Sequence, residues 1–193
     1  MGRSRAAPVS RQRDLRRVSS RGTVGLRMEK ELLSVFRALN ETSVRYLVVG
    51  GVAVVLHGHL RFTGDLDLVV QLTPSNVASA ITALERLGYK SRLPVSAASL
   101  ADPLIRKSWV EDKGMVVFPL WSPTAPGLQI DIFVTEPFPF DENYARARSV
   151  DIDGIPISVL GVSDLIAMKR KVGRPSDLAD VAALERIATL QTS

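Results

Sequence analysis

The 193-residue sequence predicts a mixed α/β (α+β) domain, in which helices flank a mixed β-sheet and further helices follow at the C-terminal end. Three observations predict this fold class. Short apolar runs typical of buried strands alternate with segments of helical periodicity. Turns rich in glycine and proline separate them. The hydrophobic fraction of 46% is sufficient for one core of ordinary size.

The first half of the domain is expected to alternate helices with strands. In chain order, the patterns predict an amphipathic helix over 28–41, a strand over 45–50, a short buried helix over 52–59, a strand over 65–72 and a helix over 74–87. The segment 52–59 is nearly all apolar and has strand propensity. A helix is favoured there because Gly50 and Gly51 precede it and a strand follows it directly.

The second half is less regular and ends in two helices. It is expected to contain strands over 114–121 and 128–134, a helical turn over 143–148, a hairpin over 150–160 and helices over 163–173 and 174–190. The hairpin is expected to turn at Asp153-Gly154, a pair that favours tight turns. Ser163 is the predicted N-cap of the first of these helices, and Gly173 is its predicted end.

The net charge of +5 is concentrated at the N-terminal end. Residues 1–25 contain seven arginines and one acid, a charge of +6, so the rest of the chain sums to −1. Because residues 1–27 lack apolar periodicity, we expect a basic, disordered tail before a domain over 28–193. Such a tail could contact RNA phosphates, could be a solvated extension without function, or could precede a natural start at Met28.

The composition also excludes several classes of protein. The chain has no cysteine, which excludes a disulfide framework and a thiolate metal site. It has no apolar stretch of the roughly 18 to 20 residues that a bilayer span requires. Its first residues have no apolar core of a signal peptide. We therefore expect a cytoplasmic protein without a membrane partner.

Three acidic residues interrupt strands that are otherwise apolar. Side chains alternate along a strand, so Asp65 and Asp67 are expected to project from the same face. On another predicted strand, Asp131 lies between two isoleucines in sequence and is expected to project from the face opposite to theirs. If the two strands are neighbours, three like charges converge, which is costly unless a divalent cation such as Mg²⁺ binds them. Taken singly, an Asp at a strand start is often a turn or cap residue.

A glycine pair precedes the first two acids by about fourteen residues. A strand that ends in Gly50-Gly51 and opens a helix presents backbone N–H groups to a phosphate without Cβ atoms in the way. A phosphate loop combined with carboxylates that bind Mg²⁺ is typical of phosphoryl or nucleotidyl transfer.

These residues carry a family resemblance. Gly50-Gly51, a short helix, Arg61, Thr63 and Asp65-Leu66-Asp67 on the next strand resemble the signature of the polymerase-β-like nucleotidyltransferase superfamily, and Asp131 resembles its third metal ligand. Many members have Gly-Ser where this chain has Gly51-Val52. Backbone amides and Thr63 are therefore expected to contact the triphosphate instead.

The C-terminal part carries a second resemblance. The segment 164–184 is similar to the C-terminal motifs of the AbiEii-like type IV toxin nucleotidyltransferases, with Lys169, Arg174, Asp177 and Asp180 at the matching positions. Lys169 and Arg174 are expected to bind the triphosphate, and Asp177 to orient one of them. The alternatives are a solvated basic helix end and a plain helix cap.

The resemblance implies a two-ion mechanism. Asp65 and Asp67 would hold the Mg²⁺ that bridges the triphosphate, and all three acids would hold a second ion, with Mn²⁺ as an expected substitute. Asp131 would also assist deprotonation of the attacking hydroxyl. The predicted site comprises catalytic Asp65, Asp67, Asp131 and Lys169, and nucleotide-binding Gly50, Gly51, Arg61, Thr63, Lys169, Arg174 and Asp177.

Two other residue types have plainer interpretations. His57 and His59 lack a third nitrogen or sulfur ligand, so packing or a place at the cleft rim is favoured over zinc binding. Trp109 and Trp121 could stack a base, but packing in the core or a lid is favoured.

The leading functional hypothesis is an enzyme that moves a nucleoside monophosphate from an NTP to an acceptor. By resemblance, the acceptor is an RNA or tRNA 3′ end and the protein is a toxin with a cognate antitoxin protein. The alternatives are a small-molecule (antibiotic) nucleotidyltransferase, for which the acids in 141–143 would line a pocket for a cationic drug, and a non-catalytic binding module.

Overall fold

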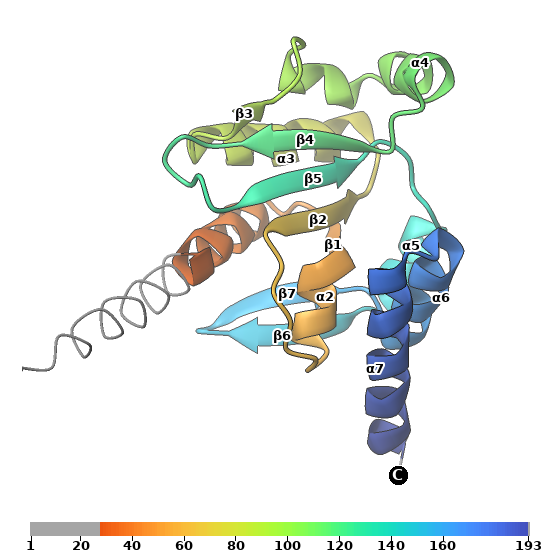
Figure 1. Cartoon of the computed structure of the whole chain (residues 1–193). Helices are drawn as coiled ribbons and strands as arrows, with labels where there is room; N and C mark the ends of the chain where they lie inside the picture. Colours follow the sequence, from red (N-terminus) through yellow and green to blue (C-terminus); the bar gives the residue numbers. More distant parts are fainter. Residues whose placement is uncertain (1–27, 193) are drawn as a thin grey trace, which may run out of the picture.

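The computed structural model describes residues 28–192, which form one seven-stranded sheet with helices around it (Figure 1). The strand order is β3-β4-β5-β2-β1-β7-β6. The strands are β1 (Tyr46–Val49), β2 (Asp65–Val70), β3 (Lys90–Ser91), β4 (Val117–Trp121), β5 (Gln129–Phe133), β6 (Arg148–Ile152) and β7 (Ile155–Val159). Parallel pairs (β1 with β7, β2 with β5) occur beside antiparallel ones, so the predicted mixed sheet is confirmed.

The helices are distributed around this sheet. A first helix covers 28–41, and the others are α2 (Gly50–Leu56), α3 (Pro74–Arg86), α4 (Pro103–Lys113), α5 (Phe140–Ala145), α6 (Val162–Val172) and α7 (Pro175–Thr192), with the 3₁₀ helix η1 (Ala97–Ala101) before α4. In the view of Figure 1, α3 lies behind the sheet, while α6 and α7 pack together at one side of it. The predicted α/β architecture with C-terminal helices is therefore confirmed.

The core explains why the acids of β2 and β5 face outward. Leu66 and Leu68 of β2 and Ile130 and Ile132 of β5 are fully buried. Because side chains alternate along a strand, the residues between them project from the opposite face of the sheet. The apolar alternation of two central strands thus fixes the face on which the carboxylates lie.

Several predicted elements occur where the sequence placed them. The helix over 28–41 is present, and the apolar segment after β1 is the helix α2. The hairpin β6–β7 turns at Asp153 and Gly154, both of which have a positive φ. Gly173 ends α6 in the left-handed conformation, as predicted.

Two boundary predictions were wrong. Ser163 is not an N-cap, because α6 begins at Val162 directly after Gly161, which takes the cap position without a side-chain bond. The helical turn expected over 143–148 is α5, which ends at Ala145, and β6 begins at Arg148.

The segment 89–113 contains three elements that were not predicted: β3, η1 and α4. The predicted basic tail falls on residues 1–27, outside the described residues. None of the helices within 28–192 has the length and apolar character that crossing a membrane requires.

Candidate active site

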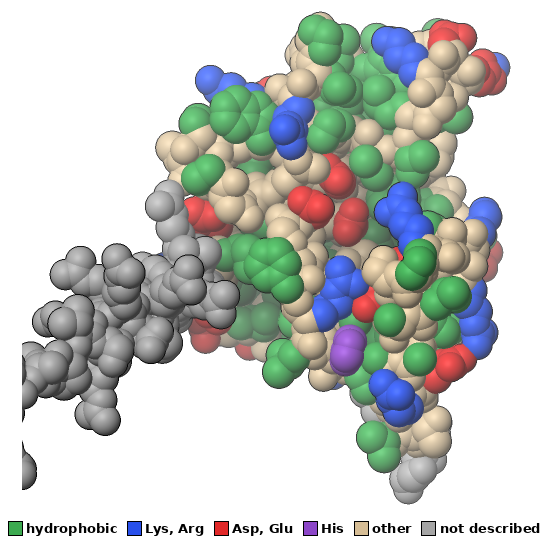
Figure 2. All heavy atoms as spheres, viewed as in Figure 1, with side chains coloured by type: hydrophobic (Ala, Val, Ile, Leu, Met, Phe, Trp, Pro, Cys, Tyr) green, Lys and Arg blue, Asp and Glu red, His purple; other side chains and the backbone are tan. Residues whose placement is uncertain are grey.

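A cavity of about 430 Å³ lies where β1 ends and β2 begins, between the sheet and the helices α6 and α7. Figure 2 shows acidic side chains gathered in the middle of this face, with basic side chains beside them. The cavity lining includes every residue that the sequence assigned to the site: Gly50, Gly51, Arg61, Thr63, Asp65, Asp67, Asp131, Lys169, Arg174 and Asp177. The fold thus brings together positions that are up to about 127 residues apart in the chain, from Gly50 to Asp177.

The three acids are neighbours on two paired strands. β2 and β5 run in parallel with Asp67 directly opposite Asp131, while Asp65 opens β2 and is exposed. Burial raises the pKa of Asp67 to about 6, and the charges of Asp131 and Asp65 contribute in the same direction. Burial also raises the pKa of Asp131. The convergence of like charges that the sequence predicted is therefore present.

The two glycines allow the backbone to approach these acids closely. A Cβ atom on Gly50, whose φ is +61°, would lie 1.9 Å from Oδ2 of Asp67. A Cβ atom on Gly51 would lie 2.5 Å from Oγ1 of Thr63. A hydrogen bond from the Gly51 backbone favours the ionised form of Asp67. The glycine pair is therefore required by packing at the start of α2, where the sequence placed the phosphate loop.

A network of ion pairs forms the opposite wall. The Lys169 Nζ lies 3.1 Å from Oδ1 of Asp177 and 2.8 Å from Oδ2 of Asp180. The same Asp180 oxygen lies 2.5 Å from Nη1 of Arg61. Burial alone would raise the pKa of Asp180, but the hydrogen bonds from Lys169 and Arg61 lower it. Asp180 therefore joins two cations that line the cavity.

One oxygen of this wall has no partner. Oδ2 of Asp177 is buried and accepts no hydrogen bond within the part of the chain that the structure describes. Because a buried acceptor without a donor is costly, this oxygen is available to a hydrogen-bond donor of a ligand.

Sequence reasoning missed three residues around the acids. Asp180 was noted only as part of a motif, although it follows Asp177 by one helical turn. Gln129 donates a hydrogen bond of 2.9 Å to Asp131, and Arg92 donates one to Gln129. Gln129 is two residues before Asp131 on one strand, a spacing that places both on one face. No sequence spacing of this kind connects Arg92 to the acids.

A metal ion would suit the chemistry of these donors. Among residues 28–192, no three His, Cys, Asp or Glu side chains are arranged so that they could hold a metal as they stand. The donor set itself consists of hard carboxylate oxygens whose mutual repulsion a divalent cation would relieve. The oxygens of Asp65, Asp67 and Asp131 therefore fit a divalent cation by their chemistry, and Asp67 and Asp131 are neighbours on paired strands.

The histidines and tryptophans have separate places. His57 is buried, and its Nε2 lies 2.8 Å from the Leu160 carbonyl oxygen, so it packs as predicted. Trp109 is also buried and stacks on Phe118. Trp121, in contrast, is 43% exposed.

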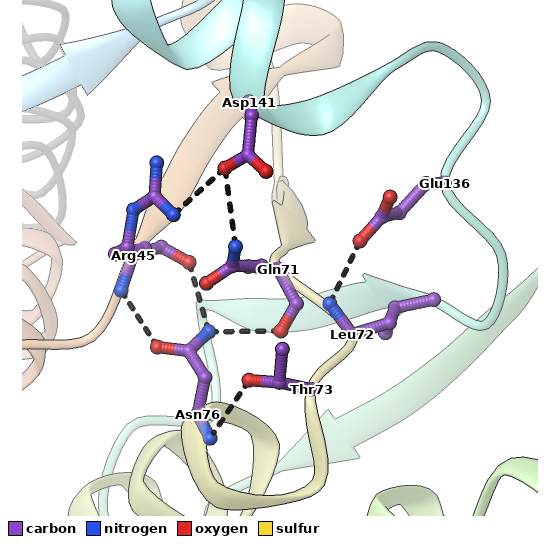
Figure 3. Close-up of polar contacts among 7 residues, drawn as sticks. All are labelled: Arg45, Gln71, Leu72, Thr73, Asn76, Glu136 and Asp141. Carbon is purple, nitrogen blue, oxygen red and sulfur yellow. Dashed lines mark hydrogen bonds and ion pairs between the residues drawn. The ribbon is translucent and has the colours of Figure 1, made fainter.

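The acids of 141–143 do not line the candidate site. Asp141 lies 2.7 Å from Arg45 and accepts a hydrogen bond of 3.1 Å from Gln71, as Figure 3 shows. Asp141 and Glu142 border another cavity, of about 840 Å³, beside α4 and α5. The expected acidic pocket for a cationic drug is therefore separate from the three carboxylates.

The family match and the fold together define a nucleotidyltransferase. The chain belongs to the family described as nucleotidyltransferase of unknown function (DUF6036), whose model matches residues 26–192. The family and the fold make the protein a transferase. No curated protein is significantly similar in sequence.

Solved structures share the fold at low sequence identity. The lincosamide antibiotic adenylyltransferase LnuA, bound to lincomycin, is 18% identical with a TM-score of 0.57, and the match covers 82% of this chain and 97% of that one. A candidate nucleotidyltransferase from Thermotoga maritima is 14% identical with a TM-score of 0.52, over 84% and 89% of the two chains. An antigenic nucleotidyltransferase-like protein from Paracoccidioides brasiliensis is 16% identical with a TM-score of 0.52, over 80% and 74%.

Proposed function

We propose that the protein transfers a nucleoside monophosphate from an NTP to the hydroxyl group of an acceptor, with Mg²⁺ as cofactor and Mn²⁺ as a substitute. One observation carries this proposal: Asp67 and Asp131 lie opposite each other on paired strands, in a cavity that also contains Asp65 and the glycine pair. When bound to these carboxylates, the cation supplies charge stabilisation for the entering and leaving oxygens.

The chain's own residues would divide the remaining work. Gly50 and Gly51 let the backbone lie directly against Asp67 and Thr63, and the backbone N–H groups there would bind the triphosphate. Lys169 and Arg174 bind its phosphate oxygens, and Asp177 and Asp180 hold Lys169 in place. These contacts orient the α-phosphorus toward the acceptor.

The reaction would need one proton acceptor. The acceptor oxygen forms a bond to the α-phosphorus, the bond to pyrophosphate breaks, and the hydroxyl proton passes to Asp131. Without a cation, burial raises the pKa of this carboxyl, and a bound Mg²⁺ would act in the opposite direction.

The acceptor that we propose is the 3′ end of an RNA, such as tRNA. The similarity of 164–184 to AbiEii-like toxins supports it, and so do the seven arginines of residues 1–25, which could contact phosphates. The protein would then be the toxin of a pair with a cognate antitoxin protein. It would act in the cytoplasm, where NTPs and tRNA occur.

A small-molecule acceptor is the second candidate. It is favoured by the near-neutral charge of the chain after residue 25 and by the likeness in fold to an enzyme named as a lincosamide adenylyltransferase. The acids of 141–143 do not support it, because they lie outside the candidate site.

The proposed function can be tested by transfer of label. The purified protein is incubated with Mg²⁺, total tRNA and each NTP in turn, labelled at the α- or the γ-phosphate. We expect label in RNA from one or more α-labelled NTPs, none from γ-labelled NTPs, and none with Asp67→Ala. Mg²⁺-dependent NTP binding without label in RNA would favour a small-molecule acceptor. The absence of such binding would contradict the proposal.

A further inference from the structure

Another cavity, of about 310 Å³, is lined by the end of β4, the start of β5 and the loop between them. Its lining includes Arg92, Trp121, Pro126, Leu128 and Gln129. Trp121 is one of the few large apolar side chains that remain exposed in the described residues, at 43%. An exposed indole at the rim of a cavity is a surface on which a flat ring can stack.

Strand register places this cavity on the same face of the sheet as the acids. Pro119 of β4 is opposite Asp131, and Asp131 is opposite Asp67. Trp121 is two residues beyond Pro119, so both project from that face. Neighbouring strands are about 4.8 Å apart, so the indole lies roughly one strand from β5.

Hydrogen bonds connect the cavity to the candidate base. Arg92 donates to Gln129, and Gln129 donates to Oδ1 of Asp131 at 2.9 Å. The hydrogen bond from Gln129 lowers the pKa of Asp131 and partly opposes the effect of burial. A guanidinium has five N–H donors, so Arg92 keeps donors for an anionic group while it holds Gln129.

The order of the strands separates two approaches to the acids. In the order β4-β5-β2-β1, the glycine pair follows β1 on one side of the carboxylates, and Trp121 is on β4 on the other side. An NTP whose phosphates lie at the glycines would leave the β4 side open to the acceptor. Displacement in line requires the acceptor and the leaving pyrophosphate on opposite sides of the α-phosphorus.

We infer that the cavity at Trp121 and Arg92 binds the 3′-terminal nucleotide of an RNA acceptor. The base stacks on Trp121, a backbone phosphate binds Arg92, and a ribose hydroxyl faces Asp131. This inference rests on the proposed function and specifies its acceptor. Every base has a π-face, so stacking on one indole binds the end of a strand with little sequence preference.

Fluorescence provides a test of binding, because the chain has two tryptophans. In the Trp109→Phe variant, Trp121 is the reporter, and tRNA added without NTP is expected to quench its emission. The Trp121→Phe variant keeps the buried Trp109 and is expected to show little quenching. Equal quenching in both variants, or none in Trp109→Phe, would overturn the inference.

Kinetics provide a second test, in which an effect on RNA binding is distinguished from a general effect on folding. For Trp121→Ala and for Arg92→Gln, we expect the KM for tRNA to rise about tenfold while the Kd for NTP with Mg²⁺ stays unchanged. Trp121→Phe, which retains a ring, should recover most of the lost affinity. Leu104→Ala is the matched control, because Leu104 is 76% exposed and lies outside this cavity.

The outcomes separate this inference from the proposed function. Normal transfer to tRNA with an unchanged KM in both variants would overturn the inference and leave the proposed function intact. Transfer to a small molecule and not to tRNA would overturn it as well. If the wild-type protein does not bind NTP in a Mg²⁺-dependent way, this result would contradict the proposed function itself.

Discussion

At the scale of single residues, the three carboxylates of the candidate site repel one another, which lowers the stability of the folded protein unless a cation binds them. Asp67 is half-buried beside two other acids, and its pKa is raised from 3.8 to about 6, chiefly by burial. Between these pH values the folded protein keeps a proton that the unfolded chain releases. The free energy of unfolding therefore falls as the pH rises through this range.

The Asp67→Asn variant should remove this penalty. In metal-free buffer at pH 8 we expect it to be more stable than the wild type by about 1–3 kcal/mol, and inactive. At pH 4 the difference should nearly vanish. Urea unfolding at the two pH values measures it. An equal gain at both pH values, or the same gain from Asp112→Asn on the exposed surface of α4, would contradict this explanation.

The glycine before α2 gives a second prediction at this scale. Gly50→Ala should be destabilising by more than about 2 kcal/mol and should abolish activity, because its Cβ would displace Asp67. Gly114→Ala is a matched control with a similar φ of +58° and no atom within 4 Å of the added Cβ. It should cost about 1 kcal/mol. Thermal unfolding of the two variants compares them, and equal losses would show that Asp67 is not the obstacle.

Part of the site could be predicted residue by residue. Strand alternation was enough to place Asp65 and Asp67 on one face, whereas Asp131 joins them only because β2 pairs with β5. The bond between Arg61 and Asp180 could not be predicted, because it joins residues 119 positions apart on a loop and a helix. No periodicity encodes such a contact.

At the scale of elements, α7 and the loop between α2 and β2 are joined by one buried carboxylate. The Asp180 side chain is 4% exposed and contacts Arg61 of the loop and Lys169 of α6. The cavity therefore has walls from α6, α7 and the loop that depend on a shared ion-pair network.

Asp180→Ala should weaken these walls together. We expect the free energy of unfolding to fall by about 3 kcal/mol, because two cations lose a buried partner. The pKa of Asp180 is lowered in the folded protein, so the loss should shrink as the pH falls below about 4. Chemical denaturation at several pH values measures it.

Asp141→Ala is the control for this prediction. Asp141 also contacts two side chains, Arg45 and Gln71, but its own side chain is 72% exposed. Its removal should cost about 1 kcal/mol or less. A larger loss from Asp141→Ala than from Asp180→Ala would contradict the role assigned to the buried network.

Elements with one apolar face were predictable, and elements that bury polar groups were not. The periodicity of 28–41 and 74–87 predicted two helices that are present. Helix α4 was not predicted, because the residues that it buries are Arg106 and Trp109. Arg106 donates hydrogen bonds to the carbonyl oxygens of Leu72 and Leu100. A buried arginine removes the apolar stripe by which a helix is recognised.

At the scale of the whole molecule, the chain divides into a basic N-terminal end and a nearly neutral remainder. The cavity lining contains four acids, Asp65, Asp67, Asp131 and Asp177, and three basic side chains, Arg61, Lys169 and Arg174, so it has no excess of positive charge. A complex of NTP and Mg²⁺ would supply both the cation and the contacts for Lys169 and Arg174.

Such a ligand should stabilise the folded protein by mass action. At a concentration of about 100 times its Kd, NTP with Mg²⁺ should add about 2.7 kcal/mol, which corresponds to a rise in Tm of several degrees. Differential scanning calorimetry measures the shift. NTP with EDTA is the control and should give a much smaller one, so equal shifts with and without Mg²⁺ would count against a metal-bound nucleotide.

The central claim is that Asp65, Asp67 and Asp131 bind a divalent cation together with an NTP. The most direct measurement is a titration of the protein with Mn²⁺, detected by electron paramagnetic resonance. It is made in the presence of an NTP analogue that cannot be cleaved between its α- and β-phosphates. A protein-free sample accounts for Mn²⁺ held by the nucleotide alone. We predict that wild-type protein binds additional Mn²⁺ and that Asp67→Asn and Asp131→Asn weaken this binding at least about tenfold. Equal Mn²⁺ binding by all three proteins would contradict the claim.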